Sequence, residues 1–165
     1  MKLSKSLYTR AIQCQKSLWL KKHNKDVLTP PNAAAQAIFQ NGNEVGDLAC
    51  KLFPNGVEIP YLNTTFQDKI NLTQEYINQG IQNIYEATFE FDGILIMIDI
   101  LNIKDNSVII NEVKSSTQVK DIYLHDASIQ YYVLNGLGYD VKKINIIHIN
   151  NEYVRDEELD INQLF

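Results

Sequence analysis

The sequence predicts a single α+β domain, an α/β sandwich in which helices pack on a largely antiparallel sheet. The main observation is a β-rich region at residues 83–113, where three apolar segments are separated by two short polar turns. Segments with helical periodicity precede and follow this region, and a further apolar strand comes near the end. The 165 residues, of which 45% are hydrophobic and 21% charged, suffice for one globular core.

The first helix is expected to begin at Ser4 or Ser6, either of which can cap it, and to continue to about Lys22. One apolar stripe with helical spacing is formed by Leu7, Ala11, Cys14 and Leu18. On that stripe Cys14 is most simply a small core residue, and Trp19 beside it is expected to pack against the sheet.

Two more helices are expected before residue 83. One covers Asn32 to Leu52 after a proline break, and the other begins at Thr64 or Thr65 and stops at Gly80. The inward-facing residues of the first are expected to be Ile38, Val45, Leu48 and Leu52. Those of the second are expected to be Phe66, Ile70, Thr73 and Ile77.

Three strands are expected to form a meander, at residues 83–91, 94–103 and 107–113. Asp92-Gly93 is typical of a hairpin turn with positive φ angles, and residues 104–107 form a second polar turn. The middle strand is too apolar on both faces to be an edge strand. The meander is therefore antiparallel, with the middle strand in its interior.

A fourth main helix is expected to begin at Asp121 and to be closed by Gly136 and Gly138. Residues 143–149 then form a continuous apolar strand, which is typical of a strand covered on both faces. The C-terminal residues that follow, 151–165, are polar and acidic. They predict either a trailing segment or the point at which a longer protein has been cut.

The elements together indicate one domain over residues 1–165. A helical N-terminal part (1–82) precedes a core (83–150) and a C-terminal tail (151–165). No apolar run approaches the ~20 residues that span a bilayer, and the basic N-terminus lacks the apolar segment of a signal peptide. We therefore expect a cytoplasmic protein without a membrane partner, and its two cysteines are expected to be reduced.

Charge is distributed unevenly along the chain, whose formal net charge is −5. Residues 1–25 contain no acid, and their basic side chains are Lys2, Lys5, Arg10, Lys16, Lys21, Lys22 and Lys25. The rest of the chain is accordingly strongly acidic. A basic N-terminal arm can contact phosphates while carboxylates elsewhere hold a metal, although a merely solvated helix face has the same composition.

Charged residues interrupt the predicted strands at Asp99, Glu112 and Lys114. Burying unpaired charges is costly, so their presence at the ends of adjacent strands indicates a site. Glu112 and Lys114 share one face because side chains two apart on a strand point the same way. Asp99, Glu112 and the Val113 carbonyl would suit Mg²⁺ or Mn²⁺, and Lys114 would orient the attacking water for phosphodiester hydrolysis. A surface Glu–Lys pair at a strand end is the plainer alternative.

Three short motifs, Asp99-Ile100-Leu101, Asn111–Ser116 and Ala127–Tyr132, resemble the successive motifs of RecB-like nucleases in the PD-(D/E)XK superfamily. The expected αβββαβ order with extra N-terminal helices is similar to the restriction-endonuclease-like core of that superfamily. Residues 4–22 and 40–49 also resemble an uncharacterised bacterial family related to CRISPR-associated RecB-like exonucleases. The likeness covers nearly the whole chain.

The resemblance implies a Mg²⁺- or Mn²⁺-dependent DNA nuclease, exonuclease-like, that acts on single strands or duplex ends in repair, recombination or defence. It implies the catalytic residues Asp99, Glu112, Lys114 and Gln130. It implies the metal ligands Asp99, Glu112 and the Val113 carbonyl, with Glu86 and Glu44 as further candidates. Candidate substrate contacts are Gln130, Tyr131, Tyr132, Lys5, Arg10 and Lys16.

The sequence departs from the family pattern in several places. Many relatives carry a histidine on the second helix, where this chain has Glu44 and Gly46, and the tyrosines follow Gln130 directly instead of four residues later. Cys14 resembles the early ligand of an iron–sulfur cluster, but Cys50 is the only other cysteine, so no cluster is expected in this chain.

Other interpretations of the chain stay open. It could be an inactive nucleic-acid-binding module that retains the nuclease fold, or a small protein-contact domain with an accidental Glu-Val-Lys. A further domain or partner subunit would be compatible with either. The pair His125-Asp126, at the start of a helix, is interpreted as structural.

Overall fold

The computed structural model describes residues 3–104 and 107–165. Within these residues, one mixed sheet has the strand order β2-β3-β4-β5-β6, and β1 pairs with the beginning of β4. The strands are β1 (Leu3–Ser4), β2 (Val57–Glu58), β3 (Asn83–Phe91), β4 (Ile94–Lys104), β5 (Ser107–Lys114) and β6 (Asp140–His148). The pairs β3–β4 and β4–β5 are antiparallel, and the other pairs are parallel. The predicted α+β class and the central antiparallel meander are therefore confirmed.

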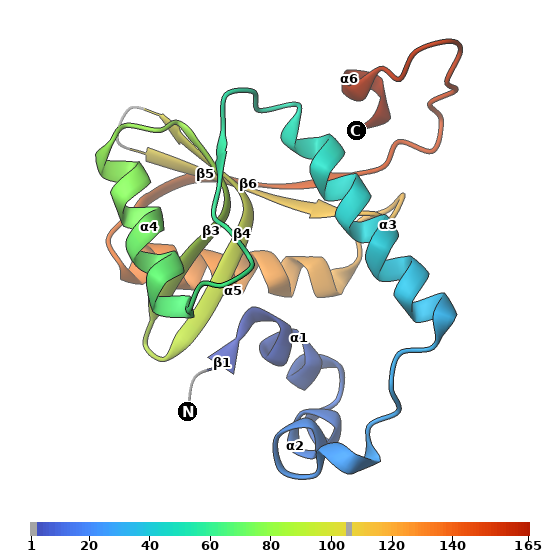
Figure 1. Cartoon of the computed structure of the whole chain (residues 1–165), viewed down its shortest axis with the longest axis vertical. Helices are drawn as coiled ribbons and strands as arrows, with labels where there is room; N and C mark the ends of the chain where they lie inside the picture. Colours follow the sequence, from blue (N-terminus) through green and yellow to red (C-terminus); the bar gives the residue numbers. More distant parts are fainter. Residues whose placement is uncertain (1–2, 105–106) are drawn as a thin grey trace.

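The helices frame this sheet as Figure 1 shows. They are α1 (Lys5–Gln13), α2 (Gln15–His23), α3 (Ala33–Cys50), α4 (Phe66–Asn78), α5 (Asp121–Gly136) and the short α6 (Ile161–Leu164), with a 3₁₀ turn at Lys25–Val27. In this view α1 and α2 form a pair below the sheet, and α3 leads from them back to it. None of the described helices combines the length and hydropathy of a bilayer-spanning segment.

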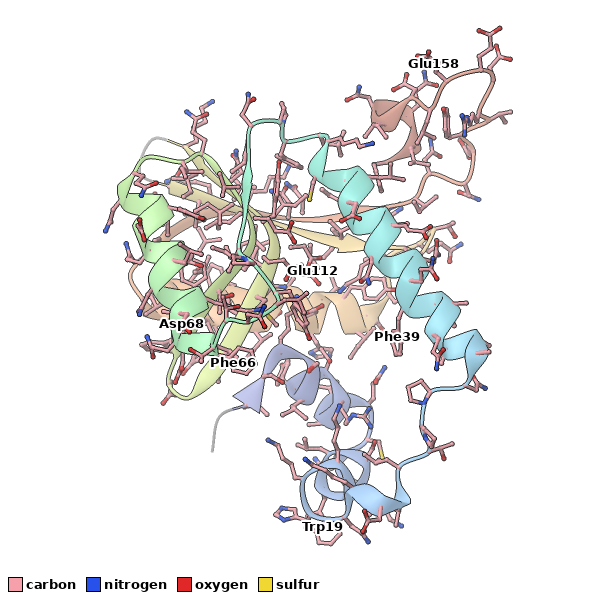
Figure 2. The ribbon with its side chains drawn as sticks, in the orientation of Figure 1. Trp19, Phe39, Phe66, Asp68, Glu112 and Glu158 are labelled. Carbon is pink, nitrogen blue, oxygen red and sulfur yellow. The ribbon has the colours of Figure 1, made fainter. Side chains whose placement is uncertain are left out.

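The N-terminal helix is split into two, which differs from the single helix expected. Ser4 caps α1 as predicted, because its hydroxyl accepts the Leu7 N–H at 3.3 Å. Cys14 is extended, with φ −164° and ψ 105°, and this separates α1 from α2. The expectation that Cys14 and Trp19 pack inward is wrong, because both are exposed. Figure 2 shows Trp19 at the outer end of α2, away from the sheet.

Helix α3 begins within one residue of the expected start, because Asn32 caps it and its carboxamide oxygen accepts the Ala35 N–H at 2.9 Å. Only its C-terminal half is covered, since Val45 and Ala49 are buried whereas Ile38 is 66% exposed. The expectation that Ile38 faces inward is therefore wrong. Its apolar spacing is helical, but the first half of α3 extends beyond the sheet that would cover it.

Helix α4 has the predicted start and stop. Thr65 and Asp68 form a reciprocal capping box, and Gly80 adopts a φ of +77° just beyond the helix. Thr73 is buried as expected, but Phe66 in the first turn is exposed. The helical periodicity therefore predicted α4 correctly, but the expectation that Phe66 faces inward is wrong.

The β3–β4 hairpin closes through Asp92 and Gly93, whose φ angles of +50° and +73° match the predicted turn. Strand β4 lies between β3 and β5 as expected. The second turn was expected at residues 104–107, and residues 105–106 lie outside the described residues. Strand β6 is at the sheet edge and half-buried, so the expectation that it is covered on both faces is wrong.

The hydrophobic core lies where α4 and α5 meet the sheet. Ile84, Ile98 and Ile110 from the three central strands are fully buried there, together with Val133 and Leu134 of α5. The C-terminal segment also folds back, because the Asn150 N–H donates to the Leu164 carbonyl at 2.7 Å. It therefore packs at the end of β6 and does not trail from it.

Candidate functional site

Three acidic residues lie side by side across the central strands. β3 pairs with β4 at Tyr85↔Ile100 and Ala87↔Ile98, so that Glu86 and Asp99 fall between these pairs. Glu112 follows the last β4–β5 pair, Ile100↔Asn111, on the same row.

The regular strand pairing is interrupted at this row of acids. Glu86 adopts a φ of +58°, which is unfavourable for a residue with a Cβ, although the β3–β4 register is the same on both sides of it. Where the β4–β5 ladder stops, the Asp99 carboxylate accepts the Val113 N–H at 2.7 Å. The backbone irregularity thus coincides with one row of carboxylates between strands that are otherwise apolar.

A lysine from the N-terminal helix enters this row. Lys5 Nζ donates to both carboxylate oxygens of Glu112, at 3.0 and 2.9 Å. It also lies 3.8 Å from an oxygen of Asp99 and 3.8 Å from an oxygen of Asp126. The parallel pairing of β1 with β4 and the Ser4 cap position the first turn of α1, and hence Lys5, over the sheet.

Helix α5 contributes Asp126 and Gln130, which lie four residues apart on one face of the helix. Lys114 Nζ lies 2.5 Å from Glu112 Oε1 and 2.6 Å from Asp126 Oδ2, bridging the two acids. Gln130 Nε2 donates to Glu112 Oε2 at 2.7 Å. The amide oxygen of the same side chain, Gln130 Oε1, is buried without a hydrogen-bond partner among the described residues. Glu112 therefore lies at the centre of the network, and Figure 2 marks its place in the middle of the molecule.

The charges of the network shift one another's titration. Burial alone would raise the pKa of Glu112, but the two neighbouring ammonium groups outweigh it and lower that pKa to about 2. Burial also opposes the charge of Lys5, yet the surrounding carboxylates hold its pKa above the ordinary value. For Asp99, burial and the Glu112 charge together raise the pKa to about 7. Asp99 is thus the carboxylate that ionises least readily.

These groups line a cleft of about 1120 Å³ between the sheet, α1 and α3. Among the described residues its acidic lining comprises Asp47, Glu58, Glu86, Asp99, Glu112 and Asp126. The lysines that line it are Lys5 and Lys114. The cleft is therefore rich in carboxylate oxygen and carries an excess of negative charge.

The donor set suits a hard cation, because carboxylate oxygens are the ligands that Mg²⁺ and Mn²⁺ prefer. One oxygen of each of Asp99, Glu112 and Asp126 lies within 3.8 Å of the Lys5 ammonium group, which stands between the three carboxylates. In the part of the chain that the structure describes, no three His, Cys, Asp or Glu side chains are arranged to hold a metal directly. The carboxylates of Asp99, Glu112 and Asp126 are chemically suitable ligands for such an ion. In this structure the ammonium group of Lys5 lies between their oxygens.

Several predicted site residues are brought together. Asp99, Glu112, Lys114 and Gln130 form the network just described, and Val113 lines the same cleft. Glu86, a further candidate ligand, lines the cleft too. Burial raises the pKa of Glu86 above its ordinary value, although the nearby charge of Lys5 acts to lower it.

Other predicted residues lie elsewhere. Glu44 is exposed on α3, where its carboxylate accepts from Gln40 at 3.0 Å, and it is not part of the cleft lining. The exposed Tyr131 and Tyr132 are also outside the lining, and the Tyr132 hydroxyl donates to Asp92 at 3.0 Å. The phenols are therefore remote from Glu112, although Gln130 precedes them directly in the chain.

Of the three basic residues expected to contact the substrate, Lys5 lines the cleft, whereas Arg10 and Lys16 do not. Arg10 Nη1 donates to Ser17 Oγ at 2.7 Å within the α1–α2 pair, and Lys16 is exposed. Neither of them is among the residues that line the cleft. Lys5, expected at a phosphate, instead binds carboxylates.

Asp126 was interpreted from the sequence as structural, yet it lies in the network. One signal could have found it, namely its position four residues before Gln130, which places both on one helix face. Asp47 on α3 also lines the cleft and was not predicted. No local pattern distinguishes it from an ordinary exposed helix carboxylate.

Replacement of Asp99 by asparagine should alter the pH dependence of stability. Because the folded state raises the pKa of Asp99, its contribution to stability is complete below the unfolded pKa near 4 and is lost as the pH rises through about 7. Asparagine still accepts the Val113 N–H without this loss. We expect urea unfolding in a chelating buffer to show Asp99→Asn gaining stability relative to wild type between pH 5 and pH 8. A constant difference across this range would contradict the assignment.

Comparison of the chain with protein-family models, with curated proteins and with solved structures gave no significant match.

Proposed function

We propose that this chain is a metal-dependent nuclease with the restriction-endonuclease-like core of the PD-(D/E)XK superfamily and RecB-like motifs. The observation that carries the proposal is the convergence of Asp99, Glu112 and Lys114 in one cleft, together with Gln130 from the following helix. These are the residues whose sequence motifs resemble that superfamily. Asp99, Glu112 and Lys114 come from two neighbouring strands, and Gln130 joins them through the packing of α5.

In the proposed mechanism Asp99, Glu112 and the Val113 carbonyl would hold Mg²⁺ or Mn²⁺. The ion would supply Lewis acidity and neutralise charge on the phosphate. Lys114 is held between Glu112 and Asp126, whose charges outweigh the effect of burial and raise its pKa. It is therefore suited to orient water and stabilise developing negative charge by remaining protonated, rather than to act as a base. Gln130 fixes Glu112 through its amide N–H.

The charge of the cleft supports a metal requirement. A phosphodiester is anionic, and the carboxylates that line the cleft outnumber its lysines among the described residues. Such a surface repels a nucleic acid backbone unless cations neutralise it. The substrate proposed is DNA, as single strands or duplex ends, and the acid-free residues 1–25 would contact phosphates away from the cleft.

One observation favours a second function, a nucleic-acid-binding module without turnover. Lys5 already neutralises part of the charge of Glu112 and Asp99, so that the fold does not depend on a metal for this purpose. A module of this kind would bind DNA through its basic arm and leave phosphodiester bonds intact. Cleavage assays separate the two functions.

The test uses metal-free protein and end-labelled single-stranded and duplex DNA, with Mn²⁺ or Mg²⁺ added back. We expect cleavage that requires the cation, is stopped by a chelator and falls at least about 100-fold in Asp99→Asn. The matched control is Asp140→Asn, an exposed strand residue paired with Lys142 at the surface, which should cleave like wild type. DNA binding without cleavage would support the second function. Cleavage that survives Asp99→Asn would contradict the proposed site.

A further inference from the structure

The position of Lys5 has consequences for how the site would accept a metal. Asp99, Glu112 and Asp126, here called the carboxylate cluster, all have an oxygen within 3.8 Å of Lys5 Nζ. This ammonium group comes from α1, outside the meander that carries the motifs. Its side chain is only 19% exposed. Lys5 is thus the cation on which the cluster oxygens converge.

A divalent cation that binds the same oxygens cannot share this position with an ammonium group. Ligand oxygens contact Mg²⁺ at about 2.1 Å, so the ion would lie between the oxygens that Lys5 contacts at 2.9 to 3.8 Å. Two cations at such a separation repel strongly in a poorly solvated site. With the ion in place of Lys5, the charges of the three cluster carboxylates, the ion and Lys114 cancel, and retention of Lys5 would add one positive charge to this group.

Lys5, rather than Lys114, is the group that can leave. Lys114 is held by two short contacts, at 2.5 Å to Glu112 and 2.6 Å to Asp126, and lies 5.3 Å from the centre of the Tyr123 ring. Lys5 is hydrogen-bonded to Glu112 alone and is 3.8 Å from the other two acids. The longer contacts to the carboxylates therefore belong to the side chain from α1.

We propose that Lys5 is an exchangeable occupant of the carboxylate cluster: a divalent cation displaces its ammonium group, which then faces the cleft as a contact for a substrate phosphate. The proposal rests on the proposed function, because it takes the cluster to be the metal centre. The backbone of α1 stays anchored by the Leu3 N–H, which donates to the Gly93 carbonyl at 2.8 Å. Only the flexible side chain moves, within a cleft that it already lines. Phosphate binding by Lys5 thereby becomes conditional on the metal.

The direct test measures the reactivity of each lysine towards reductive dimethylation, quantified by mass spectrometry, with Mg²⁺ titrated into wild-type protein in the absence of DNA. We expect Lys5 to be protected in a chelating buffer and to react about tenfold faster at saturating Mg²⁺, which is an ordinary coupling between two sites. Lys16, exposed on α2, is the internal control and should react at the same rate throughout.

A second measurement compares Mn²⁺ affinity, by calorimetry, among the wild-type protein, Lys5→Met and Lys16→Met. Removal of the competing ammonium should tighten Mn²⁺ binding about tenfold in Lys5→Met and leave Lys16→Met unchanged. If Lys5→Met does not fold, the dimethylation of wild-type protein decides the question alone.

The outcomes separate this proposal from the proposed function. Mn²⁺ binding with Lys5 still protected would overturn the exchange and leave the metal centre intact. Equal tightening in Lys5→Met and Lys16→Met would also overturn it, because a general charge effect would then suffice. Absence of Mn²⁺ binding in both wild type and Lys5→Met would overturn the exchange and the metal centre together.

Discussion

Replacement of Glu112 by alanine is expected to lower the free energy of unfolding by about 3 kcal/mol at neutral pH, at the lower end of the range for removing one partner of a buried ion pair. The Glu112 side chain is 2% exposed and accepts hydrogen bonds from Lys5, Lys114 and Gln130. Its loss leaves these donors facing one another. Asp99 and Asp126 remain nearby and limit the cost.

Urea unfolding followed by circular dichroism, in a chelating buffer, measures this loss. Glu152→Ala is a suitable control because that side chain is exposed, and its effect should stay within about 0.5 kcal/mol. A loss below about 1 kcal/mol in Glu112→Ala, which is the scale of one ordinary hydrogen bond, would show that the network stabilises the fold far less than its geometry implies. This prediction concerns the fold and holds whether or not the protein cleaves DNA.

Replacement of Lys114 by alanine is expected to reduce Mn²⁺-dependent DNA cleavage by at least about 100-fold while Mn²⁺ still binds. Asp126 and Glu112 hold the ammonium group of Lys114 in place. In the proposed mechanism this group orients the attacking water and offsets the negative charge that develops on the phosphate. It is not a metal ligand. Initial cleavage rates and calorimetric Mn²⁺ affinity therefore separate its role from that of Asp99.

The control for Lys114 is Lys142→Ala. Lys142 is also a strand lysine paired with an acid, Asp140 at 2.7 Å, but its side chain is 62% exposed on β6. Cleavage by that variant should equal the wild-type rate. If Lys114→Ala cleaves within about threefold of wild type, a change below 1 kcal/mol in the barrier, Lys114 has no catalytic role.

Much of the local structure was predictable because it depends on neighbours within a few residues. Thr65 with Asp68 specified the start of α4, and Asp92-Gly93 specified the β3–β4 turn through positive φ angles. The candidate site was predictable where it rests on strand geometry, since Glu112 and Lys114 two residues apart must share a face. Asp99 could be placed beside them because a tight hairpin limits its register.

Predictions failed where the answer depended on what covers a surface. Helical spacing identified α3 and the helical region of α1 and α2, which was expected as one helix, but it does not say which apolar residues find a partner. Trp19 and Ile38 are consequently exposed. Strand β6 has an apolar sequence and still lies at the edge, because strand order is not written in the period of a single strand.

The sequence by itself therefore determined the main helices and strands, the β3–β4 turn and the acids and lysine of the meander. Only the tertiary structure decided that Lys5, separated from Glu112 by 107 residues in the chain, lies among the carboxylates, and that Asp126 joins them. The physical reason is that caps, turns and face periodicity arise from contacts between near neighbours. The pairing of a helix lysine with a strand acid arises only when burial of both elements brings the charges together and makes their separation costly.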